Sequence, residues 1–323
     1  MRLNLHLLRL FMHVAETGSF SKAAELVCVS QPAVSKGVRE LEHQLDIELF
    51  ERGLGGHRQA GHQGVRLTEA GQALYHHAKS IFAIEQVALE DVRTRVGLQR
   101  GSLTLGASTT VASYWLPPYV AKFCQMQPGI VPRLRVGNTE WVAQQLLHYE
   151  VDFALVEGEV TDNAIVASVW REDEQVIVTY PDAAFAQRRI DARGLANQAW
   201  ILREPGSGTR QSTERLCASL GIRLVPWMEM ASNEAIARTV ASGVGVSMLP
   251  RLVVADMLRL GHLREVRING QTHLSRPLTL LRLKSRHPSP AAASMLDLLH
   301  SSDHRKPGVR QSLLAASQGF GQR

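Results

Sequence analysis

Cysteine is scarce in this sequence, and Cys28, Cys124 and Cys217 are the only three among 323 residues. They lie far apart and match no metal-binding spacing, so we expect reduced thiols in small core positions of a cytoplasmic protein and no bound metal. The chain also has no uncharged apolar run of 18 residues, so no membrane-spanning helix is expected. The N-terminal stretch lacks the small-residue cleavage pattern of a secretory leader, and secretion is not expected either.

A strong basic surplus is also missing, although the formal net charge is +6. Residues 1 to 100 hold twelve Lys and Arg against eleven Asp and Glu, whereas the stretch from Lys284 onward holds six against two. Charge alone therefore gives no reason to place a nucleic acid on the N-terminal region. The length and the apolar fraction of 45% predict a globular protein of two or three domains.

The N-terminal region carries three short helical patterns. Apolar residues at helical spacing predict a first helix that ends near Gly18, and Ser19 or Ser21 is suited to cap a second helix. Ser30 is suited to cap a third helix with Pro32 in its first turn, where the missing N–H costs no hydrogen bond.

The third helix should have one apolar and one polar face. The core set is Val34, Val38, Leu41 and Leu45, and the polar set is Gln31, Ser35, Lys36 and Arg39. Two helices, a short turn and a polar outer face on the second are typical of a helix-turn-helix, whose second helix enters the major groove of double-stranded DNA. An ordinary antiparallel helix pair with a solvated polar face is the alternative.

A glycine-rich stretch follows, which favours a hairpin over a helix, with Val65 and Leu67 in its returning strand. Basic side chains on such a hairpin would act as a wing against DNA phosphates. The basic residues here are Arg52, Arg58, Arg66, His57 and His62. The two histidines could instead form a metal pair, but no Cys or carboxylate stands at ligand spacing.

Thr68 is suited to cap a long helix that runs to about Val96. Its apolar positions keep near-helical spacing: Leu74, Ala78, Ile81, Ala88 and Val92. A helix of this length has little of its own domain to pack against, so we expect it to pair with a second copy. A helix that lies on its own C-terminal domain is the alternative.

After Gly101 short apolar strands alternate with helical stretches, which is typical of an α/β fold with parallel strands. One series covers about 102–158, a second covers about 199–251, and a strand at 276–283 returns to the first lobe. Two lobes joined by two crossings place a ligand between them, where strand ends and helix starts converge.

Two segments point to a small anion as that ligand. Residues 108–110 (STT) follow a strand in the first lobe, and residues 205–209 (PGSGT) follow a strand in the second. Free N–H groups at a helix start, with hydroxyls and glycine beside them, form an anion cradle. Arg203 and Arg210 add positive charge, unless they pair only with Glu204 or solvent. The alternative is that both segments are merely turns and caps; a Walker phosphate loop is excluded because no Gly-Lys-Ser/Thr follows.

Four motifs in order, SQPAVS (30–35), RELE (39–42), LFER (49–52) and LTEAG (67–71), resemble the LysR-type transcriptional regulators. The resemblance implies a winged helix-turn-helix at 1–67, a dimerising linker helix at 68–96, and an α/β effector-binding domain at 97–300 with two periplasmic-binding-protein-like lobes. Lobe 1 would cover about 97–178 and 276–300, and lobe 2 about 179–275. The polar, glycine-containing and basic composition of residues 301–323 predicts a disordered tail, with nonspecific attraction to DNA as the alternative.

The resemblance also implies the site residues and partners. EPGSGTR (204–210) and VDFALVEG (151–158) are similar to the branch of the family that senses small anionic metabolites. The implied partners are double-stranded DNA, a small-molecule effector without a further cofactor, and a second copy in a homodimer or homotetramer. The DNA-binding candidates are Ser30, Gln31, Pro32, Ser35, Lys36, Arg39, Arg52, Arg58 and Arg66. The effector-binding candidates are Ser108, Thr109, Thr110, Glu157, Arg203, Gly206, Ser207, Gly208, Thr209 and Gly245.

Two features depart from the family pattern. Gly37 lies within the third helix, where it should cost about 1 kcal/mol relative to Ala and remove a side chain that could contact DNA. The stretch between Arg52 and Leu67 is longer than usual, so wing contacts cannot be carried over residue by residue.

Other function classes fit less well. An enzyme would need a nucleophile elbow, a metal-ligand cluster or a paired acid and base, and the second half of the sequence shows none of these. A transported-solute receptor would share the lobes, but it would need a secretory leader and would have no use for residues 1–67. We therefore expect a DNA-binding regulator and not an enzyme.

Overall fold

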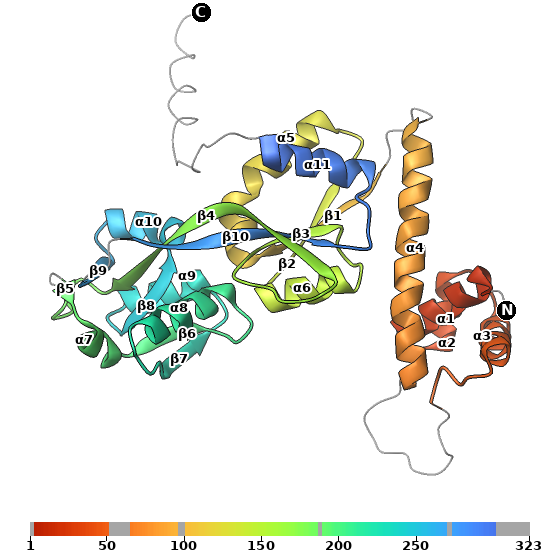
Figure 1. The fold of residues 1–323 in the computed structure, drawn as a ribbon, viewed down its shortest axis with the longest axis horizontal. Helices are drawn as coiled ribbons and strands as arrows, with labels where there is room; N and C mark the ends of the chain where they lie inside the picture. Colours follow the sequence, from red (N-terminus) through yellow and green to blue (C-terminus); the bar gives the residue numbers. More distant parts are fainter. Residues whose placement is uncertain (1–2, 52–64, 96–100, 187–188, 270–272, 302–323) are drawn as a thin grey trace, which may run out of the picture. The chain divides into compact units, whose positions relative to one another are not determined.

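The computed structural model describes residues 3–51, 65–95, 101–186, 189–269 and 273–301 (Figure 1). The chain divides into two compact units, of which the first ends at Leu89 and the second begins at Glu90. The wing candidates Arg52 and Arg58, the histidine pair of the hairpin and the C-terminal tail beyond Ser301 lie outside the described residues. Each unit is described by itself below.

The first unit is built on three short helices around an apolar core. They are α1 (Leu5–Thr17), α2 (Phe20–Leu26) and α3 (Gln31–Leu45). Their fully buried side chains include Leu8, Phe11, Val14, Val34 and Leu41. Because these residues recur at helical spacing on each element, the three apolar stripes meet in one core and leave the polar faces outside.

The helix ends follow the capping signals in the sequence. Gly18 ends α1 in the left-handed conformation, with φ 61°, and the Ser19 hydroxyl accepts a hydrogen bond from the N–H of Lys22 at the start of α2. Both predictions are confirmed. Ser30 occupies the cap position of α3, but its side chain makes no capping hydrogen bond. The sequence therefore predicts the position of the α3 cap correctly, but the expected side-chain hydrogen bond of Ser30 is not present.

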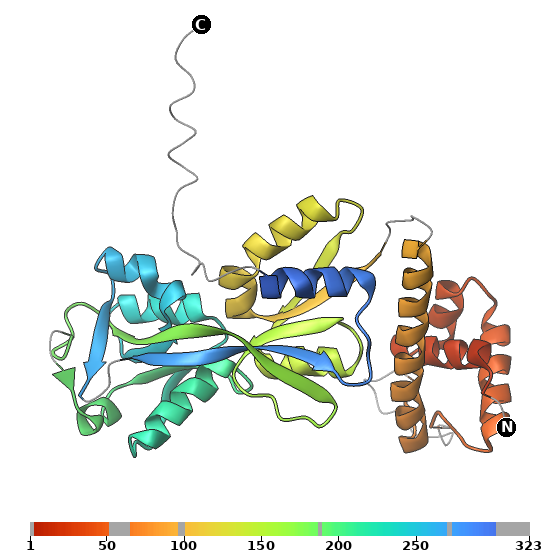
Figure 2. The ribbon, with the colours of Figure 1, turned by 45° about the horizontal axis from the view of Figure 1, so that its top comes forward.

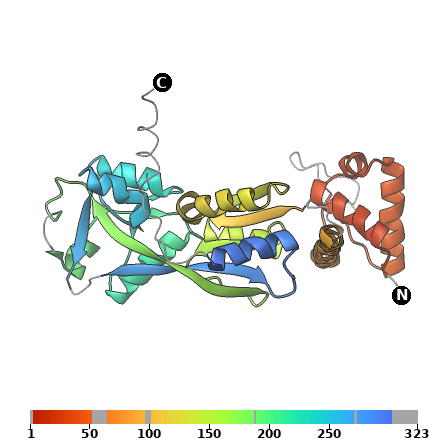
Figure 3. The same ribbon diagram turned by 90° about the horizontal axis from the view of Figure 1, so that it is seen from above.

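A fourth helix, α4 (Glu69–Arg95), follows and is capped by Thr68, whose hydroxyl accepts from the N–H of Gly71 at 3.0 Å. Figure 3 views α4 nearly end on, with α1 to α3 gathered along one side. Part of its apolar stripe joins the core of the first unit, namely Leu74, Ala78, Ile81 and Phe82. The expectation that α4 has little of its own domain to pack against is therefore wrong for its first half. Farther along, Ile84, Leu89 and Val92 remain exposed.

The second unit is built on one mixed sheet with strand order β2-β1-β3-β10-β4-β8-β6-β7. Its main strands are β1 (Leu103–Ser108), β2 (Pro132–Gly137), β3 (Phe153–Glu157), β4 (Ile165–Thr179), β6 (Trp200–Arg203), β7 (Pro226–Met230), β8 (Val246–Pro250) and β10 (Leu274–Leu283). The strands at each end pair in parallel, as predicted, whereas β4 and β10 run antiparallel to their neighbours. An all-parallel sheet is thus wrong for its centre.

The two long strands β4 and β10 pass side by side from lobe 1 to lobe 2 (Figure 2). Their register shifts at a bulge between Leu278 and Thr279. They are the two crossings that the sequence predicts, and β4 spans 15 residues from Ile165 to Thr179. A short pair, β5 (Arg189–Ile190) and β9 (Arg264–Ile268), extends lobe 2 without a matching sequence prediction.

Helices cover both faces of each lobe, as buried parallel strands require. In lobe 1, α5 (Pro117–Met126) and α11 (Pro290–Ser301) lie on one face and α6 (Thr139–Leu147) on the other (Figure 1). A π-helical turn, Val111–Trp115, precedes α5. In lobe 2, α7 (Ala192–Ala196) and α8 (Gly208–Ser219) pack on one face, and α9 (Asn233–Ala241) and α10 (Arg251–Arg259) on the other.

The cysteines depart from their predicted places. Cys217 is buried, and burial raises the pKa of its thiol to about 11. Cys28 and Cys124 are both exposed. Cys28 lies outside the core, in the turn between α2 and α3, with φ 56°. Only one of the three thiols is therefore a core side chain.

Candidate functional site

The outer face of α3 carries the predicted DNA-reading side chains. Gln31, Pro32, Lys36 and Arg39 are exposed and Ser35 is half-buried. Arg39 folds back along the helix, and its Nε and Nη2 donate to the carbonyl and hydroxyl of Ser35 at 3.2 and 3.4 Å. No other element of the first unit's described residues buries this polar face, which is the condition for a reading helix.

Gly37 does not lie on that polar face. It is buried against α1, and a Cβ at this position would come within 2.6 Å of Leu10 Cδ1. The inference that glycine here removes a DNA contact is therefore wrong. The missing side chain instead allows α1 and α3 to approach closely.

The base of the predicted wing is present in the described residues. Phe50 and Leu67 form an antiparallel bridge, and the Glu51 N–H donates to the Arg66 carbonyl at 2.9 Å. Arg66 is exposed at this base. Glu42, which sequence reasoning passed over, accepts hydrogen bonds from the N–H groups of Leu49 and Phe50. This carboxylate ties the end of α3 to the start of the wing.

In the second unit the hydroxyls of the predicted lobe 1 cradle bind a buried carboxylate. Ser108 and Thr110 both donate to Glu157, which is 2% exposed at the end of β3. Asn233, at the start of α9 in lobe 2, donates to the Thr110 hydroxyl at 3.1 Å. The structure thus brings Ser108, Thr110 and Glu157 together, but as an internal network that reaches across the two lobes.

Thr209 belongs to a second buried cluster that no sequence pattern indicates. Its hydroxyl accepts from Nη1 of Arg276, and the same guanidinium lies 2.9 Å from Asp173 and 3.8 Å from Glu157. Arg276 and Asp173 are register partners on β10 and β4. Burial raises the pKa of Asp173, and the adjacent Arg276 opposes that rise. Such a pair has no local sequence signal, because its members are distant in the chain.

Arg203 is the predicted site residue that spans the seam between the lobes. It ends β6 in lobe 2, its side chain is 1% exposed, and its Nη1 donates to the Thr109 hydroxyl of lobe 1 at 3.3 Å. Its Nε and Nη2 donate to both carboxylate oxygens of Glu204 at 2.7 and 2.9 Å. From lobe 1, the Asn138 amide also donates to Glu204, at 3.4 Å.

Tyr114 adds a further bond across the seam, because its hydroxyl donates to Glu234 of lobe 2 at 3.0 Å. Burial and the neighbouring Glu234 carboxylate raise the pKa of Tyr114 to about 12. The phenol therefore keeps its proton at neutral pH and remains a donor. The seam is closed by polar contacts from Thr109, Asn138 and Tyr114 on the side of lobe 1.

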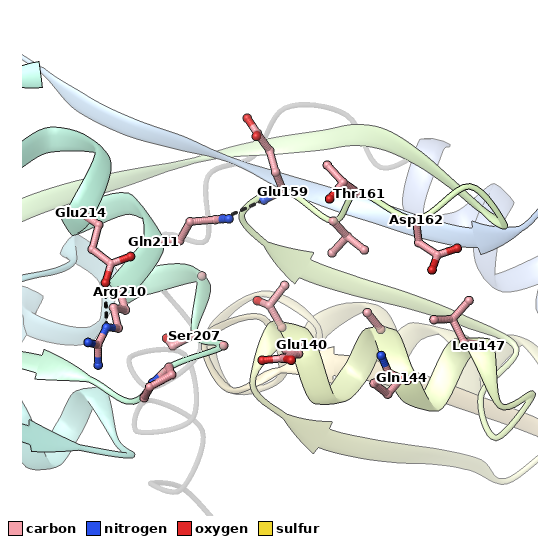
Figure 4. A pocket seen from close by; sticks show the side chains of 16 residues that line it. Glu140, Gln144, Leu147, Glu159, Thr161, Asp162, Ser207, Arg210, Gln211 and Glu214 are labelled. Carbon is pink, nitrogen blue, oxygen red and sulfur yellow. Dashed lines mark hydrogen bonds and ion pairs between the residues drawn. The ribbon is translucent and has the colours of Figure 1, made fainter. Parts of the chain in front are cut away.

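A cavity of about 540 Å³ opens beside this seam, between α6 of lobe 1 and the start of α8 in lobe 2 (Figure 4). Gly206, Ser207 and Gly208 of the predicted lobe 2 cradle line it. The Ser207 hydroxyl is buried without a hydrogen-bond partner. The remaining charged residues of the wall are Glu140, Glu159, Asp162, Glu214 and Arg210. Because carboxylates dominate this wall, the cavity itself is a poor place for an anion.

Two predicted residues, Gly245 and Arg210, do not bridge the lobes, although Arg210 lines the cavity beside the seam. Gly245 precedes β8, has φ 66°, and stands against the Ala199 carbonyl at the start of β6. Since Arg203 lies at the other end of β6, the structure does not bring Gly245 to the other effector candidates. Arg210 pairs with Glu214 and Glu229, so its charge is already matched.

Comparison with known proteins matches both units to one family. Residues 5–72 match the model described as bacterial regulatory helix-turn-helix protein, lysR family, and residues 97–303 match the LysR substrate binding domain. The chain belongs to the LysR family. This regulator therefore combines a DNA-binding helix-turn-helix with an effector-binding domain, and the fold class expected from its sequence is confirmed.

The regulator is also similar to individual characterised and solved proteins. It is 33% identical over 306 residues to the RuBisCO operon transcriptional regulator of Allochromatium vinosum, covering 94% of this chain and 98% of the other. A full-length OxyR variant from Pseudomonas aeruginosa shares the fold with a TM-score of 0.70, at 23% identity and over 93% and 95% of the two chains. The Synechocystis CcmR regulatory domain, solved in complex with 2-PG, has a TM-score of 0.57 at 26% identity, covering 62% of this chain and 96% of that one.

The A. vinosum relative is named as a transcriptional regulator. Among the described residues of this chain, no helix is long and apolar enough to span a membrane.

Proposed function

We propose that this LysR-family regulator senses a small anionic metabolite held in the seam between its lobes, with Arg203 as the principal anion-binding residue. The observation that carries the proposal is the placement of Arg203, whose guanidinium is 1% exposed and bonds to Thr109 across the seam. A guanidinium matches two oxygens of a carboxylate or phosphate, and burial strengthens that attraction.

The names of similar proteins support an anionic ligand. The regulatory domain of CcmR was solved with 2-PG bound, and it is 26% identical to this chain. The A. vinosum relative is named for the RuBisCO operon. Coupling of such an effector to DNA requires that the anion bind two arrangements of the lobes with different affinity.

Calorimetric titration of the full chain with 2-PG and with inorganic phosphate tests the proposal. We expect one of these anions to bind, and Arg203→Gln to weaken it at least about tenfold, because a charge-assisted pair contributes roughly 1.5–3 kcal/mol. Arg215→Gln is the matched control, since Arg215 is 43% exposed and pairs with Glu159 on the surface. Equal losses in both variants, or binding by uncharged ligands alone, would contradict an anion site at Arg203.

The DNA-reading part of the proposal assigns contact to the outer face of α3. Gln31, Ser35, Lys36 and Arg39 would reach the groove, with Ser30 and Pro32 near the phosphates at the start of the helix and Arg66 at the wing base. The exposure of this face supports the assignment.

A further inference from the structure

An internal carboxylate already occupies the anion-binding position at Arg203. Glu204 receives both Nε and Nη2 of the guanidinium, and the Asn138 amide of lobe 1 binds the same carboxylate. Burial works against ionisation of Glu204, but the bonds and charge of Arg203 hold its pKa below the usual glutamate value. The carboxylate is therefore ionised at neutral pH and fully engaged with its donors.

The two partners differ in their freedom to move. The Arg203 side chain is 1% exposed and fixed by packing, whereas the Glu204 side chain is 22% exposed. Two of the three guanidinium nitrogens bond to Glu204, and the third bonds to Thr109. An incoming anion can bind Nε and Nη2 of Arg203 only if the Glu204 carboxylate leaves them. Because the Glu204 side chain is partly exposed, it can move into solvent.

From these contacts we infer that Glu204 is a tethered competitor, which holds the anion site of Arg203 until an effector of higher charge displaces it. The inference rests on the proposed function. Exchange of one carboxylate for another at the same donors gains little, because the bonds lost and made are alike. An effector must therefore bring more charge or a second anionic group. A phosphate ester or a dianion meets this requirement, and a simple monocarboxylate does not.

Displacement also changes a contact between the lobes. The bond from Asn138 to Glu204 joins α6 of lobe 1 to the end of β6 in lobe 2. When Glu204 leaves Arg203, this bond is lost, and the anion takes its place between Arg203 and the donors of lobe 1. Effector occupancy is thereby coupled to the contacts across the seam.

The test compares Glu204→Gln with the unchanged full chain, using inorganic phosphate and acetate as probes in calorimetric titrations. We expect phosphate to bind at least about tenfold more tightly to the variant, because removal of the tethered charge ends the competition. Acetate should bind measurably to Glu204→Gln and not to the unchanged chain. Without anion, the variant should melt at a lower temperature and recover more on addition of phosphate, because Arg203 is left unpaired.

Glu229→Gln is the matched control. It also removes a carboxylate from an arginine pair in lobe 2, but Arg210 keeps its second partner Glu214. The control should change phosphate affinity by less than about threefold, because Glu229 bonds to Arg210 and not to the Arg203 guanidinium. Glu204→Asp serves as a second variant that keeps the charge on a side chain one methylene shorter, and its affinity should lie between those of Glu204→Gln and the unchanged chain.

The possible results distinguish the competitor role of Glu204 from the proposed function as an anion sensor. If phosphate binds the unchanged chain and Arg203→Gln abolishes binding, but Glu204→Gln binds no more tightly, the competitor role is wrong and the proposed function stands. A gain of equal size in Glu229→Gln would also overturn it, because the effect would then be general electrostatics. If neither 2-PG nor phosphate binds the unchanged chain or Glu204→Gln, the proposed function fails and this inference with it.

Discussion

Lys36 and Arg39 are the exposed cations on the outer face of α3, and they are the residues on which DNA recognition is expected to depend. Both residues are exposed, and among the described residues the side-chain hydrogen bonds of Arg39 stay within its own helix, to Ser35. Either side chain can therefore be redirected to a base edge or a phosphate at little cost.

Arg39→Ala should weaken binding to the regulator's own operator by roughly 1–3 kcal/mol if Arg39 reads a base, and should reduce the salt dependence by about one ion if it contacts a phosphate. Fluorescence anisotropy at several salt concentrations distinguishes the two. Arg259→Ala, which removes an exposed cation of lobe 2, should leave affinity unchanged. If Arg39→Ala and Lys36→Ala both bind as tightly as the unchanged chain, the reading face is elsewhere.

Individual residues are predictable from the sequence where the signal is local. Ser19 and Thr68 stand where capping residues are needed, and their hydrogen bonds are present. The sequence does not predict the roles of Glu42, Asp173 and Arg276, because only the folded chain brings these residues to their partners.

At the scale of elements, the contact between α1 and α3 depends on Gly37. The two helices approach so closely there that Leu10 Cδ1 occupies the space that a Cβ would need. Glycine lowers the intrinsic stability of α3 by about 1 kcal/mol relative to alanine. The close helix contact offsets that loss through the burial of Leu7, Leu10 and Val38.

Gly37→Val should therefore lower the free energy of unfolding by about 1–3 kcal/mol through overpacking. Urea titration followed by helical circular dichroism gives the measurement. Ser35→Val is the matched control, because it places the same β-branched side chain in the same helix on the face away from α1. If the two substitutions lower the free energy of unfolding equally, the close contact between α1 and α3 does not explain the glycine at position 37.

Strand β4 shows why elements of this sheet are only partly predictable. Residues 171–174 read Arg-Glu-Asp-Glu, a charged run that suggests a loop, yet they continue a strand of 15 residues. They are stable there because β10 pairs with them along the crossing and Arg276 meets Asp173. Tertiary pairing overrides local preference in such a position.

At the scale of the whole regulator, both outer edges of the second unit's sheet expose apolar side chains. On the β2 edge these are Leu134, Val136 and Trp141 of α6, and on the β7 edge they are Val225, Trp227 and Met228. We expect two copies to pair so that the β2 edge of one meets the β7 edge of the other. A two-fold axis then repeats this contact, so that both edges of both copies are covered.

Trp227→Asp should shift the full chain toward smaller oligomers in sedimentation velocity. The expected rise in the dissociation constant is at least about tenfold, since a large aromatic side chain is typical of an interface anchor. Val169→Asp provides the control, because Val169 is 69% exposed but lies on β4, which is neither of the two outer strands β2 and β7. If Trp227→Asp leaves the distribution of oligomers unchanged, self-association involves other surfaces, such as the exposed residues of α4.

The paired strands β4 and β10 carry a mechanical consequence. They are the two covalent connections between the lobes, and they are paired with each other from Leu274 to Leu283. Any change in the angle between the lobes must bend both strands together, and their pairing is interrupted at the register shift between Leu278 and Thr279. A bound effector can therefore move one lobe against the other only as far as this pair of strands bends.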